Sequence, residues 1–115
     1  LVFGLVGALT YQAVRAGWTR MYFGDPFADV GWFVASIVLT IALHDTWFYW
    51  THRWMHRPRV FRLVHRVHHR STNPSPWAAY AFHPLEAVVQ AAIFPLAVLL
   101  VPMHPLVFVV FMVWQ

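Results

Sequence analysis

The chain has 115 residues, of which 60% are hydrophobic and 10% charged, and eight arginines with no lysine give it a formal net charge of +4. Soluble domains have roughly 45–50% apolar and about 25% charged residues, so this composition argues against an ordinary soluble protein and favours a membrane protein. The absence of cysteine excludes disulfides, thiolate zinc sites, iron–sulfur clusters and a cysteine nucleophile.

The N-terminal half alternates between apolar and polar segments. Residues 1–14 are mostly apolar and predict a helix, whereas residues 15–29 contain Gly17, Gly24 and the turn signal Asp25-Pro26 and predict a connection. Residues 30–51 form an apolar run of about twenty residues, which is long enough to cross a ~30 Å hydrocarbon layer.

The C-terminal half predicts shorter helices. Residues 52–70 are basic and rich in histidine, and should be helical on either side of Pro58; residues 71–76 have the composition of a loop. The stretch from residue 87 to the end carries no charge, and Pro95, Pro102 and Pro105 should divide it into two short helices or a hairpin. We therefore expect an all-α, integral-membrane helical bundle with its polar chemistry on one face.

The chain begins at Leu1 without a methionine and stops at Gln115 within an apolar stretch. We therefore expect residues 1–115 to be a single partial membrane domain, truncated at both ends.

Two histidine clusters give the sequence its chemistry. His52 and His56 are four residues apart, and His65, His68 and His69 follow the spacing i, i+3, i+4, so each cluster occupies one helix face. Imidazoles without thiolates suit Fe, Zn, Cu or Ni rather than Mg or Ca. Five such ligands exceed what one tetrahedral zinc needs, which favours two metals or an octahedral one. Chance spacing or ordinary packing is the alternative.

Two acidic or histidine positions precede the first cluster. His44 lies about two turns before His52 and is a possible additional ligand. Asp45 is better phased to His52 and is a candidate carboxylate for a ligand histidine, or else a helix-end cap or an arginine partner. Ionisable groups inside an apolar run are candidates for function because they are costly there. Tyr49 lies between Asp45 and His52 and is a weaker candidate.

Three more polar residues follow the clusters. His83, before Pro84, is a candidate for supporting a ligand, for ligation itself or for helix entry, and we favour the supporting role. Glu86 belongs to the same segment and is a possible supporting group or further ligand. His104 stands between prolines and is expected to be structural or interfacial.

Six of the eight arginines fall in the histidine-rich stretch: Arg53, Arg57, Arg59, Arg62, Arg66 and Arg70. Such a patch can bind nucleic acid. The apolar segments on both sides favour instead a segment that faces the cytoplasm under the positive-inside rule, with no nucleic-acid partner.

The ordered motifs resemble the fatty acid hydroxylase/sterol desaturase superfamily, over about residues 30–95. They are HDTWFYWTHRWMH (44–56), HRVHH (65–69) and AFHPLE (81–86), and the last of them, with the TNPSPW of residues 72–77, looks closest to the sterol desaturases.

The resemblance implies a membrane non-haem di-iron oxidoreductase that uses O₂ to hydroxylate or desaturate a sterol, fatty acyl chain or related lipid. It places metal ligands at His52, His56, His65, His68 and His69, implies two Fe ions (with Zn possible in vitro), and implies an electron donor of the cytochrome b5 or ferredoxin type. The family has a further histidine cluster nearer its C-terminus, which does not follow His83 here.

Three other classes remain open at this point. A bis-His haem electron-transfer protein would leave most of the clustered histidines unexplained, and a metal transporter would place ionisable groups in several spans. A zinc-dependent membrane hydrolase would need one tetrahedral zinc and no O₂.

Overall fold

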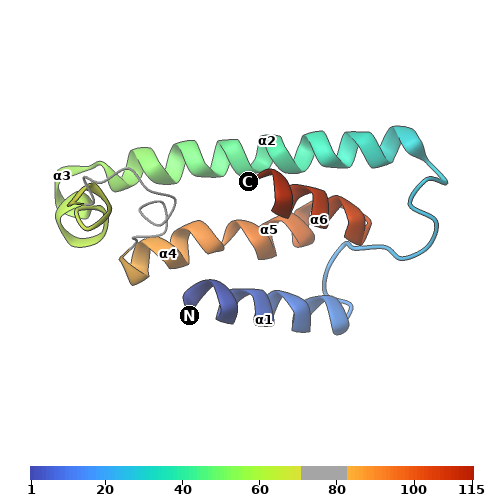
Figure 1. Cartoon of the computed structure of the whole chain (residues 1–115), viewed down its shortest axis with the longest axis horizontal. Helices are drawn as coiled ribbons and strands as arrows, with labels where there is room; N and C mark the ends of the chain where they lie inside the picture. The colour runs from blue at the N-terminus through green and yellow to red at the C-terminus, as the bar shows by residue number, and fades with distance from the viewer. Residues whose placement is uncertain (71–82) are drawn as a thin grey trace.

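A computed structural model describes residues 1–70 and 83–115, and within these ranges every regular element is helical (Figure 1). This confirms the all-α prediction. The elements are α1 (Val2–Arg15), α2 (Val30–Met55), α3 (Pro58–Val60), the π-helical turn η1 (Phe61–His65), the 3₁₀ turn η2 (His68–Arg70), α4 (Pro84–Ala91), α5 (Ile93–Leu100) and α6 (Pro105–Trp114). The predicted loop over residues 71–76 lies outside the described residues.

The long helix α2 is the axis of the molecule. Its 26 residues begin after Asp29, whose carboxylate accepts the backbone N–H of Trp32 at 2.8 Å. At 1.5 Å per residue it extends about 39 Å. It is the one helix in the described ranges that is long and apolar enough to cross a membrane, and only 11% of its most apolar 18-residue window is buried. The core helix of a soluble protein would be mostly buried instead.

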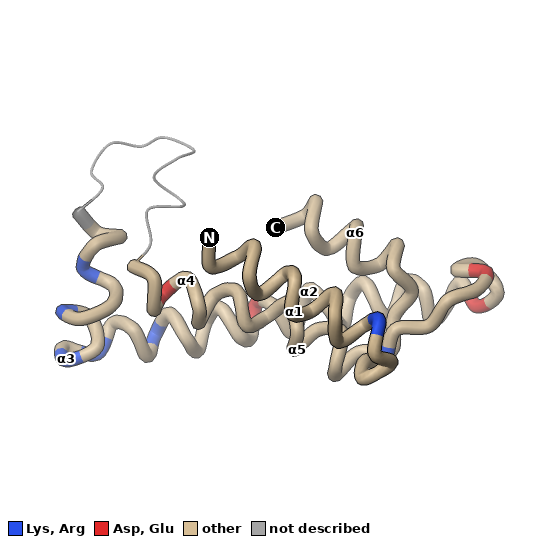
Figure 2. Tube along the Cα trace, turned by 90° about the horizontal axis from the view of Figure 1, so that it is seen from below, with Lys and Arg blue, Asp and Glu red and all other residues tan. Residues whose placement is uncertain are grey.

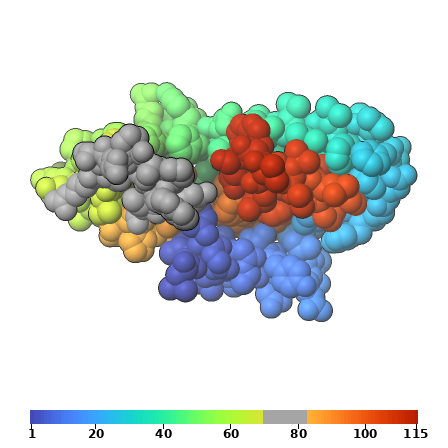
Figure 3. Space-filling view, viewed as in Figure 1, coloured from blue at the N-terminus to red at the C-terminus, as the bar shows by residue number. Residues whose placement is uncertain are grey.

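The other helices pack along α2 and each other. α6 and α5 lie against α2, and α1 lies alongside α4 and α5 (Figure 1). Two small apolar clusters hold the bundle together, one around Phe94 and Phe111 and the other around Met103 and Val107. In the space-filling view, α6 covers the middle of the viewed face and α1 runs along one edge (Figure 3).

The connection over residues 16–29 is pinned to the C-terminal helices. The backbone N–H of Arg20 donates to the carbonyl of Val98 at 2.9 Å, and that of Tyr22 donates to Met103 at 3.1 Å. Gly17 takes a φ of +72°, a left-handed conformation that glycine adopts without steric cost. The predicted polar connection is confirmed, and its role is to tie α1 to the α5–α6 corner.

The C-terminal stretch forms short helices, as predicted, but Pro95 does not divide it. Pro95 lies inside the first turn of α5, where a missing N–H is tolerated, and the break between α4 and α5 comes at Ala92. Pro105 begins α6, and Nδ1 of His104 accepts the N–H of Leu106 at 3.2 Å. The expected structural role of His104 is therefore confirmed.

The charged residues are unevenly distributed over the described residues. Figure 2 shows most of the blue arginine positions gathered around α3 at one end of the bundle. Red acidic positions lie at the opposite end, in the middle of the bundle and on α4. The positive end is the end that carries the histidines.

Candidate metal centre

The end of α2 and the turns after it position the histidines. His52 lies on the last full turn of α2, and His56 is its C-cap residue. Pro58 restricts Arg57 to an extended backbone and then begins α3, so the chain reverses direction. The π-helical turn η1 ends at His65, and such turns are frequent at functional sites. The second cluster is thereby brought back against the first.

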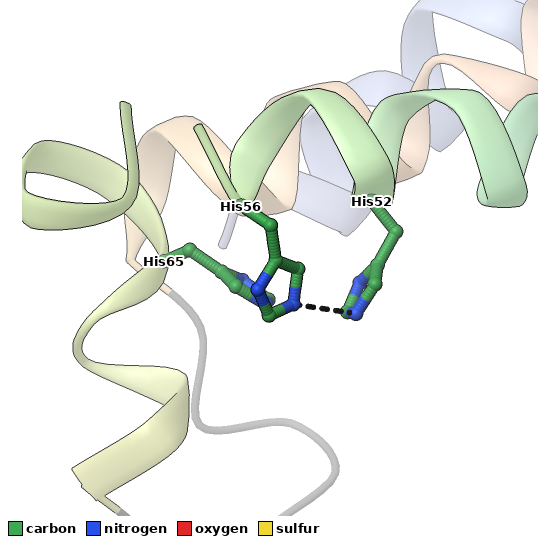
Figure 4. Close-up of side chains that lie close together, drawn as sticks. All are labelled: His52, His56 and His65. Atoms are coloured by element: carbon green, nitrogen blue, oxygen red, sulfur yellow. Dashed lines mark hydrogen bonds between the residues drawn. The ribbon is translucent and has the colours of Figure 1, made fainter. Parts of the chain in front are cut away.

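Three histidine side chains converge in Figure 4: those of His52, His56 and His65. One ring nitrogen from each lies within 4.8 Å of the others, and Nε2 of His52 and Nε2 of His56 are 3.1 Å apart. Neutral imidazole nitrogens this close can share a proton or a cation.

His68 and His69 join the same group. The ring centroid of His69 lies 4.7 Å from that of His65 and 5.1 Å from that of His56, and the ring of His68 stacks on His65 at 5.3 Å. The structure therefore brings together all five histidines that the spacing predicted as ligands.

A carboxylate lies against the most buried of these histidines. Nδ1 of His65 is 2.7 Å from Oε1 of Glu86, and both side chains are essentially inaccessible, at 0% and 1% exposure. Glu86 comes from α4, which lies 21 residues further along the chain. This contact ties α4 to the histidine cluster and gives Glu86 the supporting position that the sequence suggested for it.

Burial and like charges keep His65 neutral. Burial, followed by the neighbouring His69, His56 and His68, lowers the pKa of His65 to about 4. Burial also raises the pKa of Glu86 above its ordinary value. With Glu86 as the carboxylate acceptor, the single N–H of the neutral His65 ring lies on Nδ1, and Nε2 carries a lone pair.

The donor set fits a transition metal. Nε2 of His65 is buried and has no hydrogen-bond partner among the described residues. Leaving a buried polar atom without a partner destabilises the folded state by about 1–3 kcal/mol, so a bound ligand that supplies the partner would stabilise it. A histidine that gives one nitrogen to a carboxylate and offers the other to an ion is the common arrangement around protein-bound metals.

Asp45 is not the carboxylate of the cluster, contrary to its phasing along α2. Its Oδ1 lies 3.2 Å from Nδ1 of His44, and its side chain is 64% exposed. His44 itself stacks on Phe48 and lies edge-on to Phe111 and Trp114, outside the group of five rings. Asp45 contacts a histidine of its own helix, whereas the carboxylate that contacts the cluster is Glu86 of α4.

Two weaker candidates also take other roles. The hydroxyl of Tyr49 accepts a hydrogen bond from Arg53 at 2.8 Å, and its side chain is exposed. Nδ1 of His83 accepts the backbone N–H of Leu85 at 3.3 Å and so caps α4. His83 thus takes the helix-entry role, one of its three predicted alternatives, because Pro84 starts the helix there. Its favoured supporting role stays a prediction.

Two phenylalanines belong to the site but were missed. The ring of Phe61 lies within 6 Å of His56, His65 and His69 by ring centroids. Phe48 stacks on His52 at 5.2 Å with an interplanar angle of 19°. Their spacing offers a signal, since each lies four residues before a clustered histidine.

Comparison with known proteins places these residues in context. The model of the family described as fatty acid hydroxylase matches residues 37–115, more than half of the chain and all of the clustered histidines. No solved structure matches the chain significantly.

Curated relatives carry sterol names. A Delta(7)-sterol 5(6)-desaturase of Aspergillus fumigatus is 46% identical over 66 residues, which cover 56% of this chain and 21% of that protein. A Delta(7)-sterol-C5(6)-desaturase of Nicotiana tabacum is 32% identical over 84% of this chain and 37% of its own length. Lathosterol oxidase of Mus musculus is 30% identical over 80% of this chain and 31% of its length. The chain thus spans between about a fifth and two fifths of these relatives.

Proposed function

Because the chain belongs to the fatty acid hydroxylase family, we propose that the complete protein is a membrane oxidoreductase that uses iron and O₂ to hydroxylate or desaturate a lipid. The observation that carries the proposal is the convergence of five imidazoles around a buried His65 whose Nε2 has no partner among the described residues.

Each residue has a defined task in this proposal. His52, His56, His65, His68 and His69 would hold iron, together with further ligands from the rest of the protein. When bound, iron supplies the activation of O₂ for oxidation of an unactivated C–H bond. Glu86 accepts a hydrogen bond from the Nδ1–H of His65, which fixes the orientation of the ring and presents Nε2 to the cluster. Phe48 and Phe61 shield two sides of the cluster and limit access of water.

A sterol is the substrate class that the relatives favour. Three of them are named for oxidation of a sterol nucleus. The described ligands do not separate hydroxylation from desaturation, since both begin with removal of hydrogen from carbon.

We place the histidine-rich end on the cytoplasmic side, where an electron donor of the cytochrome b5 or ferredoxin type could reach it. Arg53, Arg57, Arg59, Arg62 and Arg66 are exposed there, at the end of the candidate span (Figure 2). Single cysteines introduced at Arg59 and at Asp25 provide a test, since this chain has no cysteine of its own. An impermeant thiol reagent added to intact cells should label only Asp25→Cys, and labelling of Arg59→Cys alone would reverse the orientation.

A single zinc ion is the competing occupant. Nitrogens of His52, His56 and His65 lie within 4.8 Å of one another, and three ligands suffice for a catalytic zinc. A zinc enzyme would have no need of O₂, so dependence on O₂ distinguishes the zinc hypothesis from the iron hypothesis.

The deciding experiment is lipid oxidation by the full-length protein in membranes that lack their own sterol desaturase. Supplying Δ7-sterols under air should give a product with two hydrogens fewer or one oxygen more, and none under argon. A His68→Ala, His69→Ala double variant of equal abundance should be inactive. Equal turnover without O₂, or an unimpaired double variant, would exclude the proposal.

A further inference from the structure

An apolar cavity lies between α1, α2, α4, α5 and α6, and its wall includes Phe48, which also contacts the histidine cluster. Its volume is about 540 Å³, within the roughly 300–1,000 Å³ of small-molecule sites. Most of its lining is aromatic or aliphatic, including Phe94 and Phe108 from the two C-terminal helices. Its size and lining suit one lipid molecule.

The lining restricts the charge of the occupant. Among the described residues, no Asp, Glu or Arg faces the cavity, and the polar members of the wall are Thr10, His44, Gln90 and Gln115. The hydroxyl of Thr10 already donates to the carbonyl of Val6 at 2.8 Å. A charged headgroup would find no counter-charge there, whereas a neutral hydroxyl could be satisfied by a single neutral acceptor.

His44 is held in place to be that acceptor. Its ring stacks on Phe48 and meets Trp114 edge-on, with ring centroids 5.3 Å apart. The exposed carboxylate of Asp45 lies 3.2 Å from Nδ1 and accepts a hydrogen bond from the Nδ1–H. Nε2 then carries the lone pair, and the ring is 20% exposed on the cavity wall.

Phe48 joins the cavity to the cluster. It lines the cavity, and it stacks on His44 on one side and on His52 on the other, at centroid distances of 6.2 and 5.2 Å. A molecule in the cavity therefore meets a side chain that itself contacts the clustered His52.

We propose that this cavity binds the apolar body of a neutral lipid and that Nε2 of His44 accepts a hydrogen bond from the hydroxyl group of that lipid. To regard the bound lipid as the substrate rests on the proposed function. The binding itself requires no metal.

Energy transfer from tryptophan provides a direct binding assay, since Trp47 is part of the cavity wall. The probes are dehydroergosterol, its acetate ester, and a straight-chain conjugated tetraene alcohol, titrated into the metal-free full-length protein in detergent. The wild-type protein should bind at least one free alcohol saturably. The acetate ester should bind about five- to tenfold more weakly than dehydroergosterol itself, because the ester cannot donate the hydrogen bond of the free hydroxyl. Comparison of dehydroergosterol with the straight-chain alcohol shows whether the cavity accepts a sterol or an extended acyl chain.

Two glycines of α1 offer a matched pair of blocking variants. Gly7 lines the cavity and Gly4 does not, and a Cβ added at either position meets no atom within 4 Å. Gly7→Phe should abolish saturable transfer, while Gly4→Phe should bind like the wild type. Gly7→Leu replaces Gly7→Phe if the latter is not recovered folded. Unchanged binding in the Gly7 variant would overturn the proposal.

His44→Phe tests the hydrogen bond separately from the cavity. The substitution keeps an aromatic ring against Phe48 but removes the acceptor. The variant should bind alcohol and ester equally, because it has lost only the preference for the hydroxyl. A preserved preference would show that His44 is not the acceptor and would overturn that assignment.

The outcomes separate this inference from the proposed function. No saturable binding of either alcohol, in a protein that still binds iron and oxidises lipid, would overturn the cavity and leave the function standing. Saturable binding that Gly7→Phe abolishes, in a protein without O₂-dependent turnover, would support the cavity and contradict the function.

Discussion

The two ends of α2 treat buried polar groups in opposite ways. Towards its N-terminal end, Ser36 and Thr40 are fully buried, and each hydroxyl donates to a backbone carbonyl of the preceding turn, at 2.8 and 2.7 Å. At the histidine end, Nε2 of His65 and Oε2 of Glu86 are buried and have no partner among the described residues. The first end satisfies its buried polar atoms within its own helix, whereas the second leaves two of them without a partner in the described part of the chain, as the proposed metal site requires for Nε2 of His65.

The largest contrast is expected between histidines at the two ends. His65→Ala removes the buried imidazole of the cluster and should abolish most metal binding by the full-length protein. Metal content of protein purified in detergent measures this. His104→Ala, at the other end, should retain the wild-type metal content. An equal loss of metal in both variants would show that the histidine end is not the metal site.

Glu86 and Asp45 provide a matched pair of carboxylates next to histidines. Glu86→Gln keeps an oxygen acceptor for Nδ1 of His65 but removes its charge, and changes of this kind weaken metal affinity by about 10–100-fold. Asp45→Asn should leave metal affinity unchanged, because Asp45 contacts His44 outside the cluster. Competition with a chromophoric chelator measures both. A larger loss of metal affinity in Asp45→Asn than in Glu86→Gln would instead identify Asp45 as the supporting carboxylate.

A moderate effect on stability is expected at the end without metal. His104→Ala removes the N-cap of α6, which should lower the free energy of unfolding by about 1 kcal/mol. His104→Asn, which can still accept the N–H of Leu106, should recover most of it. Thermal unfolding in detergent measures the difference, and identical midpoints for wild type and His104→Ala would show that the cap is not stabilising.

The smallest effect is expected for Tyr49. Tyr49→Phe removes the hydroxyl that accepts from Arg53 on the exposed face of α2, so the free energy of unfolding should change by no more than about 0.5 kcal/mol. Metal content should be unchanged. Loss of metal in this variant would contradict this and show that the Tyr49 hydroxyl contributes to metal binding.

The sequence predicted what depends on local periodicity. The spacing of His52 and His56 predicted their shared helix face at the end of α2. The second cluster was also expected on one helix face, but it lies on the π-helical turn η1 and the 3₁₀ turn η2, which bring it against the first cluster. The contact of Glu86 with His65 depends on how α4 packs, 21 residues further along the chain, and no periodicity encodes that distance. The alternatives for Asp45 stayed open for the same reason, since helical phase does not show that its carboxylate contacts His44 on the same helix.

The departures in backbone geometry have a similar origin. Pro95 was expected to help divide the C-terminal stretch, but the effect of a proline depends on its position, and Pro95 lies in the first turn of α5, where a missing N–H is tolerated. The π-helical turn over Phe61–His65 has no signature in the sequence, because its register is set by the packing of His65 against α4 and the other histidines.

The central claim is that the five clustered histidines hold iron. Metal analysis of the full-length protein, expressed in iron-replete cells and purified anaerobically in detergent, tests it most directly beside the His68→Ala, His69→Ala double variant. We predict about two iron ions per wild-type chain, the count of a two-metal site, and their loss in the variant. One zinc without iron, or metal content that the substitutions leave unchanged, would contradict the claim.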